Sequence, residues 1–373
     1  VEEEIRKEIK KSNEQLNILN YYIQILEFSK GVISENLDNT EFTIEDVNKI
    51  KTEDEKLNRA KNIYIDFESI GYTKEYLNEG IEQYNDFINY HFNIDFNGRT
   101  SNDNIYDIND TDYGDSNINN IKDSESHSTH VSGIISGDRN NKKGNKGINN
   151  LVEIMALRAI PNGDEYDKDV ARAIRYAVDN GAKIINGSFG KYFSSNPEWV
   201  IDAIRYASKK DVLVVAAAGN ESKDLDLLSN DNYPNDQFFN KNEFSDTFIK
   251  VGASTINLNE NFTAYFSNYG KINVDIFAPG VDIYSSVPND KYKFQDGTSM
   301  ASPVVSGIAS LIMSYFPKLS AKKVKEIILK SGIDIDLKIG NLGSNKHFRE
   351  YSKSGKLINA YNALILASKS KRE

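Results

Sequence analysis

Three short stretches of the chain carry side chains suited to nucleophilic chemistry. The first, QDGTSMASPVVSG at 295–307, places Ser299 just ahead of an apolar run with helical spacing. This pattern predicts that Ser299 lies at or near a helix N-terminus, where free backbone N–H groups point outward. A serine there is either an N-cap or a nucleophile whose negatively charged intermediate would meet the positive end of the helix.

The second stretch, SESHSTHVSGIISG at 124–137, contains two of the four histidines in the chain. His127 and His130 are three residues apart at the start of a predicted helix of small residues. Zinc peptidases place their histidines four apart around a glutamate, and no glutamate lies between these two. The pair is therefore either an ordinary surface or core histidine pair or a metal site of another kind.

The third stretch, VLVVAAAGNES, ends a predicted buried strand in Asn220. In open α/β sheets ligands bind at the carboxyl ends of the strands, so this position suits an amide that contacts a ligand. An asparagine after glycine is also a common turn residue. Taken alone, the position leaves both interpretations open.

Together, HSTHVSG, AAAGNES and GTSMASPVVSG resemble the corresponding blocks of the subtilisin-like serine peptidases, the subtilases, whose usual forms are H-G-T-H-V-A-G, A-A-G-N and G-T-S-M-A-[ST]-P. The resemblance covers about residues 90 to 367. It implies that Ser299 is the nucleophile and His127 the general base, with His130 as a second, non-catalytic histidine. It also implies that Asn220 and the N–H of Ser299 stabilise the oxyanion.

The segment INGSFG at 185–190 resembles the substrate-binding strand of the same family. By this resemblance the substrate is a polypeptide, bound in an extended form. The residues expected to contact it are Ser188, Phe189 and Gly190, which would pair with its backbone, and Ala217, Ala218 and Gly219, which would form the walls of the primary specificity pocket.

The aspartate of the family's triad has no match in this sequence. Asp66 and Asp95 follow short apolar runs, but neither is followed by the Ser/Thr-Gly of the family's aspartate strand. We therefore expect this strand upstream of Val1, which would make the chain a fragment of a longer serine endopeptidase with little activity by itself. The alternative is a catalytically inactive relative that binds extended peptides.

The remaining pattern indicates an α/β fold. Strands are expected at 153–157, 183–186, 212–218, 248–253 and 274–277, and helices at 167–179, 197–209 and 299–315. Nearly continuous apolar strands between such helices are typical of a mostly parallel central sheet flanked by helices, as in the subtilisin-like fold.

The expected domain organisation has three parts. Residues 1–96 form a helical insertion subdomain, with capping boxes at Thr43–Asp46 and Thr52–Glu55, and this insertion resembles one found in large bacterial subtilases. Residues 97–126, rich in Asn, Asp, Ser and Gly, form a polar surface loop, and 127–373 form the catalytic core, incomplete at its N-terminal side. The many carboxylates and amides of the loop make calcium binding possible, but no calcium-binding motif supports it, so we predict no metal and no cofactor.

Composition excludes several classes of protein. The net charge is −10 with interspersed basic residues, which argues against a nucleic-acid partner. With no cysteine there is neither a disulfide framework nor a thiolate site. No apolar run approaches the roughly 18 residues of a membrane span. The family resemblance implies an extracytoplasmic location, whether secreted, periplasmic or at the cell surface.

Overall fold

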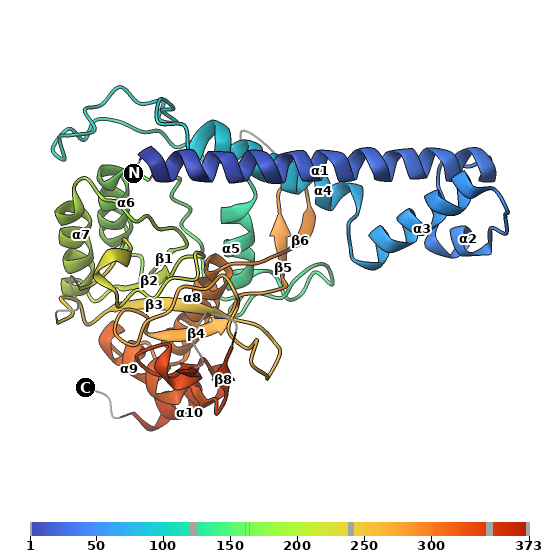
Figure 1. The fold of residues 1–373 in the computed structure, drawn as a ribbon. Coiled ribbons are helices and arrows are strands. Elements are labelled where there is room, and N and C mark those ends of the chain that lie inside the picture. The colour runs from blue at the N-terminus through green and yellow to red at the C-terminus, as the bar shows by residue number, and fades with distance from the viewer. Residues whose placement is uncertain are drawn as a thin grey trace. The chain divides into compact units, whose positions relative to one another are not determined.

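A computed structural model describes residues 2–119, 125–160, 162–163, 165–237, 242–340 and 346–370. The chain divides into two compact units. The first contains residues 1–100 and 161–164, and the second contains 101–160 and 165–373 (Figure 1). In the described part of the chain, no helix combines the length and the apolar character that crossing a membrane requires.

The first unit is helical. Its elements are α1 (Glu2–Leu37), α2 (Ile44–Lys49), α3 (Glu55–Ser69), α4 (Lys74–Asp86) and a short π-helix η1 (Phe87–His91). Helix α1 packs against both α3 and α4. The apolar spacing of α1 buries Leu26 and Ile33 completely against a core that includes Tyr64 and Leu77. This unit therefore has a hydrophobic core of its own.

Helix capping in this unit follows the sequence at one position and departs from it at another. The capping box of Thr43 and Asp46 at the start of α2 is confirmed. The predicted box of Thr52 and Glu55 is wrong, because Asp54 caps α3. Asp54 stands directly before the first helical residue, so its carboxylate reaches a free N–H of the first turn. The hydroxyl of Thr52 instead accepts the N–H of Asp54.

The second unit contains a six-stranded sheet in the order β1-β2-β3-β4-β10-β7. All neighbouring pairs are parallel except the last, in which β7 runs antiparallel to β10. The strands are β1 (Ile184–Gly187), β2 (Leu213–Ala217), β3 (Phe248–Ser254), β4 (Ile276–Pro279), β7 (Ile333–Asp334) and β10 (Lys356–Leu357). The first four agree within two residues with the predicted strands.

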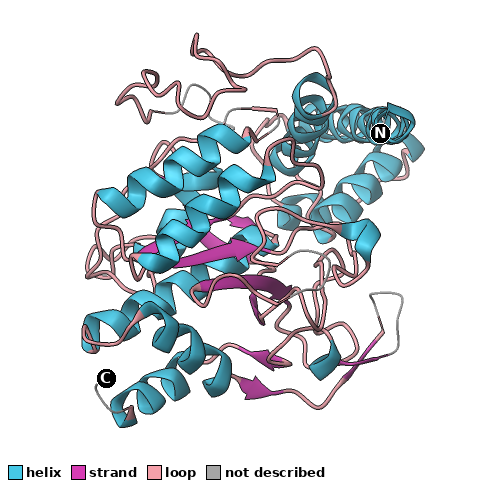
Figure 2. Ribbon diagram, turned by 90° about the vertical axis from the view of Figure 1, so that its left-hand side faces the viewer, coloured by secondary structure: helices cyan, strands magenta, loops and turns pink. Residues whose placement is uncertain are grey.

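Helices cover both faces of this sheet, as Figure 2 shows for its central strands. Strand β2 explains why: Leu213 and Val215 join the core formed with one set of helices, while Val214 and Ala216 join the core formed with another. These helices are α8 (Thr298–Tyr315), α9 (Ala321–Ser331) and α10 (Ala360–Lys369) on the first face and α6 (Asp167–Asp179) and α7 (Pro197–Lys209) on the second. The predicted α/β fold class is confirmed.

Smaller elements complete the second unit. They are helix α5 (His127–Ser136), the hairpin β5 (Ile283–Val287) and β6 (Lys291–Gln295), the pair β8 (Lys338–Ile339) and β9 (Lys346–His347), and the 3-10 turns η2 (Leu228–Asn230) and η3 (Phe348–Glu350). Helix α5 packs against both β5 and α8. The residues described between 97 and 126 form neither helix nor strand.

The strand predicted at 153–157 is absent. This stretch belongs to neither a helix nor a strand, and Ile154 and Met155 are both 42% exposed. A strand requires a neighbour for its backbone hydrogen bonds, and no described strand pairs with this stretch. Its apolar composition is that of a buried strand, so the prediction failed for lack of a partner.

Candidate active site

Three segments of the second unit meet at the carboxyl edge of the parallel sheet. Strand β1 leads into Ser188, and its neighbour β2 leads into Asn220. Helix α8 starts nearby, because the N–H of Gly297 donates to the carbonyl of Gly280 at 2.8 Å, directly after β4. The topology thus gathers residues that are more than 100 positions apart in the sequence.

Ser299 lies in the first turn of α8. The N-cap of this helix is Gly297, so Ser299 is not a cap and that alternative is wrong. Its Oγ donates to the carbonyl oxygen of Ser188 at 3.3 Å. The hydroxyl of Ser188 in turn donates to the carbonyl of Ser299 at 2.8 Å. The two serines therefore hold the start of α8 against the end of β1.

The amide of Asn220 is oriented by Thr298. Its Oδ1 accepts the N–H of Thr298 at 2.9 Å and the hydroxyl of Thr298 at 3.0 Å. That hydroxyl also accepts the N–H of Gly219 at 3.0 Å. Because both contacts use the amide oxygen, the Nδ2 group remains available as a donor, and no hydrogen bond in the described residues occupies it. Sequence reasoning missed Thr298, although it directly precedes Ser299.

His127 is the first residue of α5, the helix that packs against α8. The residue is exposed, but protein atoms crowd its imidazole. This crowding, together with the neighbouring His130, holds the pKa of His127 below its ordinary value. The imidazole is therefore mostly neutral near pH 7 and can accept a proton.

His130 occupies a different environment from its neighbour. It is completely buried, and its Nε2 lies 3.1 Å from the carbonyl oxygen of Lys293 in β6. The hydroxyl of Ser285 in β5 donates to the carbonyl oxygen of His130 at 2.7 Å. His130 thus fastens α5 to the hairpin, which fixes the position of the residue at the start of that helix.

The segment after β1 offers free backbone groups. In the described part of the chain, no backbone hydrogen bond uses the N–H groups of Ser188, Phe189 or Gly190. The ring of Phe189 packs on the core beneath α6 and α7, and Gly190 is exposed. The pairing resumes at Lys191, whose N–H and carbonyl bond to Tyr233 at 2.9 and 2.8 Å.

The end of β2 and the residues after it are more enclosed than expected for pocket walls. Ala217 and Ala218 are buried, whereas Gly219 is half-buried and has a φ of +99°, which favours glycine. A Cβ at Gly219 would lie 2.8 Å from a carboxylate oxygen of Glu221. The side chains next to Gly219, those of Glu221 and Asn268, are therefore polar.

A polar cluster beside Gly219 was not foreseen from the sequence. The hydroxyl of Tyr192 donates to the carboxylate of Glu221, and the amide of Asn268 donates to both. Burial, followed by the charge of Glu221, raises the pKa of Tyr192. The ammonium of Lys223 lies 3.9 Å from the centre of the Tyr192 ring. Tyr192 and Asn268 are 76 positions apart, so local patterns could not reveal their contact.

Among the residues that the structure describes, no carboxylate is bonded to His127. Asp66 and Asp95 both belong to the first unit. No hydrogen bond or ion pair within the described ranges joins a carboxylate to the His127 ring. Within the same ranges, no group of three or more histidine, aspartate or glutamate side chains is arranged to hold a metal ion.

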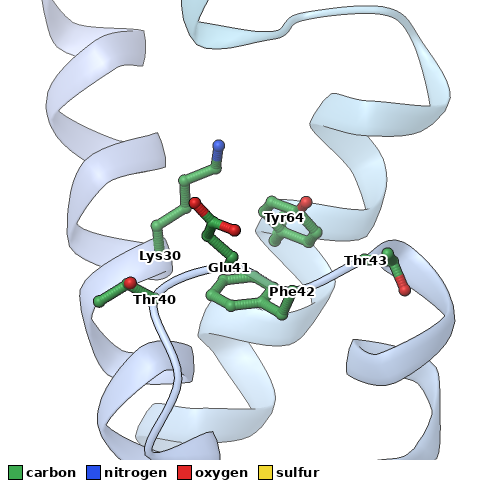
Figure 3. Close-up of a pocket in the computed structure, with 6 residues that line it drawn as sticks. All are labelled: Lys30, Thr40, Glu41, Phe42, Thr43 and Tyr64. Carbon is green, nitrogen blue, oxygen red and sulfur yellow. The ribbon is translucent and has the colours of Figure 1, made fainter.

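The first unit contains an open depression of about 500 Å³ (Figure 3). Its lining residues are Lys30, Thr40, Glu41, Phe42, Thr43 and Tyr64. The Lys30 ammonium lies over the ring of Tyr64 at 5.6 Å, and the Phe42 and Tyr64 rings meet edge to face. The depression combines no nucleophile with a base, so the candidate chemistry lies at the sheet edge of the second unit instead.

Comparison with known proteins identifies the family of the chain. The model of the subtilase family matches residues 43–353. A thermophilic serine proteinase of Bacillus sp. (strain AK1) is 36% identical over 261 residues, which cover 69% of this chain and 55% of that protein. The cell wall-associated protease of Bacillus subtilis (strain 168) is 35% identical over 234 residues, which cover 62% of this chain and 24% of that protein.

A solved structure shows the same similarity. The prenylagaramide maturation protease PagA is 28% identical, with a TM-score of 0.50 over 64% of this chain and 82% of that chain. The chain thus spans about half the length of the first Bacillus relative and about a quarter of the second.

Proposed function

Because the chain belongs to the subtilase family, and therefore has the subtilisin-like α/β fold, we propose that its second unit is the catalytic domain of a serine endopeptidase. One observation carries the proposal. Ser299 stands in the first turn of α8, beside an Asn220 amide whose oxygen is held by Thr298 so that its NH₂ group is free. A nucleophile beside an oriented donor is what acyl transfer requires.

In the proposed reaction the Oγ of Ser299 attacks the carbonyl carbon of the scissile peptide bond. His127 takes the hydroxyl proton and later gives it to the leaving amine. A serine hydroxyl is a poor nucleophile near neutral pH, so it depends on a neutral base. The lowered pKa of His127 supports this role, because it keeps the imidazole unprotonated.

The negative charge that forms on the substrate oxygen needs donors that are already in place. We assign Asn220 Nδ2 and the backbone N–H of Ser299 to this oxyanion. The positive end of the α8 dipole adds to their effect. In subtilisin, loss of the equivalent amide costs about 2.7 to 4 kcal/mol of transition-state stabilisation. The reaction requires no cofactor and no metal ion.

The substrate in this proposal is an extended polypeptide. Its backbone would pair with the free N–H groups of Ser188 to Gly190 and with the carbonyl groups of Phe189 and Gly190, as one strand pairs with another. Gly219 would border the primary specificity pocket, with Ala217 and Ala218 supporting it from behind. The location that fits this activity is extracytoplasmic, in line with the cell wall-associated relative.

In this proposal the aspartate of the triad lies outside residues 1–373. Among the described residues β1 ends the sheet, and its Ile184 to Asn186 are only half-buried. Residues 153–157 also pair with no described strand. A further strand that pairs with these segments could bring a carboxylate to His127. In subtilisin, loss of the aspartate alone lowers kcat by about 3 × 10⁴.

A fluorophosphonate probe tests the nucleophile directly in the full-length protein. We expect one serine to be labelled and expect Ser299→Ala to abolish the labelling. Ser314→Ala is the matched control, because Ser314 is an exposed serine on the same helix and should leave labelling intact. Labelling that persists in the Ser299→Ala protein contradicts the assignment.

The second candidate function is a catalytically inactive subtilase relative that binds extended peptides. The observation that favours it is the absence, in the described residues, of a carboxylate bonded to His127. Turnover of a peptide p-nitroanilide by the full-length protein separates the two candidates. Peptide binding without turnover and without probe labelling would support the inactive relative.

A further inference from the structure

A buried ammonium lies within the central sheet, close to the proposed substrate-binding edge. Lys250 is in the middle of β3, a strand whose seven residues are all buried, and it is 1% exposed itself. Lysine is almost never fully buried without partners, because removal of its charge from water is costly. Its position therefore requires an explanation from its contacts.

The three hydrogen-bond acceptors of the Lys250 ammonium all lie on one loop. Nζ donates to the carbonyl of Asn232 at 3.1 Å, to the Oδ1 of Asn232 at 2.6 Å and to the carbonyl of Pro234 at 2.8 Å. An ammonium has three donors, so this loop satisfies the whole group. Asn232 is itself 4% exposed. The lysine thus fixes the conformation of residues 232–234 from beneath.

The same loop supports the segment that follows β1. Tyr233, between the two residues that bind the ammonium, pairs in both directions with the backbone of Lys191. Lys191 directly follows Gly190, and a Cβ built on Gly190 would lie 2.9 Å from the carbonyl oxygen of Tyr233. The ammonium is therefore connected to Lys191, the residue after the Ser188–Gly190 segment, by its hydrogen bonds to the loop and by those of Tyr233 to Lys191.

Carboxylates from other parts of the chain act on the charge of Lys250. Asp275 accepts the backbone N–H of Lys250 at 2.7 Å. Burial lowers the pKa of Lys250 to about 7, while the charges of Asp236, Asp275 and Glu221 oppose that lowering. A second buried lysine, Lys325, lies 3.0 Å from Glu243 and 3.8 Å from Asp275.

We infer that Lys250 is a positioning residue, whose ammonium holds the 232–234 loop and through it the Ser188–Gly190 segment in the form that binds an extended peptide. The inference rests on the proposed function and deepens it. Lys250 touches no substrate, and its effect acts on binding rather than on the nucleophile. The sequence of the strand, FIKVGAS, does not show that its lysine is buried, and therefore gives no sign of this role.

The test uses Lys250→Met, which removes the donors and keeps the length of the side chain. With Ala-Ala-Ala-Phe p-nitroanilide and the full-length protein, we expect KM to rise about tenfold, the loss typical of hydrogen bonds to a charged group. We expect kcat and the rate of fluorophosphonate labelling to change less than about twofold, because Thr298, rather than this loop, holds the amide of Asn220.

Lys325→Met is the matched control. It removes another buried ammonium, whose partners are carboxylates rather than the 232–234 loop, so KM should stay within about twofold of the wild-type value. If a single variant fails to fold, each change is combined with Asp275→Asn, which removes one positive and one negative charge together. An unchanged KM in the Lys250 variants, or an equal rise in the Lys325 variants, overturns the inference.

A binding measurement separates this inference from the proposed function. In the Ser299→Ala background, the Kd of fluorescein-labelled Ala-Ala-Ala-Phe should rise about tenfold on Lys250→Met, by the same loss of anchoring. If the wild-type protein neither turns over nor reacts with the probe but this Kd shift appears, the endopeptidase proposal fails and the positioning role stands. An unshifted Kd rejects the positioning role whether or not the protein is an enzyme.

Discussion

Thr298 makes a residue-scale prediction about how the oxyanion donor is held. Thr298→Val keeps the side-chain shape but removes the hydroxyl that bonds both Asn220 and Gly219. Because the amide can then rotate, we expect kcat to fall about tenfold with little change in KM, as befits an interaction made in the transition state. Steady-state kinetics on a peptide p-nitroanilide measures both constants.

The control for this change is Thr247→Val. Thr247 is also buried, but its hydroxyl has no hydrogen-bond partner among the described residues. It directly precedes β3, at the end of the strand away from the carboxyl edge of the sheet. It should leave kcat unchanged. Equal kcat values in the Thr298→Val and wild-type proteins would show that Asn220 does not need this anchor.

His127 makes a second prediction at this scale. Its pKa is depressed first by nearby protein atoms and then by His130, so in the folded chain the imidazole should titrate below 6.5. Activity that depends on the neutral ring is therefore lost only as the pH falls through this lowered value. An NMR titration of the ring proton measures the pKa.

The neighbouring histidine provides an internal check. His130→Gln removes the second cause of the lowering, so the pKa of His127 should rise part of the way towards 6.5. A carboxylate supplied to the ring by a further strand should raise it as well. A His127 pKa above 6.5 in the chain of residues 1–373 would contradict the structure's account of the site.

At the scale of elements, an ion pair connects the polar segment after residue 100 to α6. The side chains of Lys168 and Asp103 are both 1% exposed, and the Lys168 ammonium lies 2.5 Å from the Asp103 carboxylate. The ammonium also donates to the carbonyl of Asn104 at 2.8 Å. Lys168→Met leaves a buried carboxylate without its counter-ion. We expect it to lower the free energy of unfolding by about 3 to 5 kcal/mol, measured by urea denaturation.

The double variant Lys168→Met/Asp103→Leu distinguishes lost attraction from stranded charge. Because it removes both ions, it should be less destabilised than the single variant. If instead the two losses simply add, the pair does not act as a unit, and another contact holds the segment on α6.

The elements themselves were predictable where a local pattern fixes them. Strand β2 is apolar throughout, and α6 has the regular spacing of a helix with one buried face, so both agree with the sequence. The stretch 153–157 has the same apolar character but no partner. Pairing depends on residues elsewhere in the chain, and for that reason composition alone cannot decide it.

For the whole molecule, the division into two units predicts two unfolding transitions. Leu26 is completely buried in the core of the first unit. Leu26→Ala should destabilise that unit by about 2 to 5 kcal/mol and leave the transition of the second unit unchanged in calorimetry. A single transition that shifts as a whole would show that the units unfold together.

The candidate site was predictable only in part, for a reason that concerns the whole chain. Ser299, His127 and Asn220 each stand in a recognisable local block, which is why the sequence reveals them. Their supports, such as the Lys250–Asn232 contact, join residues that share no local pattern. The fold alone brings these residues together, so a single sequence contains no signal for them.

The placement of Ser299 on α8 has a consequence for heat inactivation. Most of α8 is buried, and it packs against β1 to β4 as well as α5, α9 and α10. Its amide hydrogens should exchange with solvent only when the second unit opens globally, rather than by fraying. Loss of probe reactivity on heating should therefore follow the unfolding rate of that unit. We expect no partly unfolded form in which the sheet remains but α8, with Ser299, has melted.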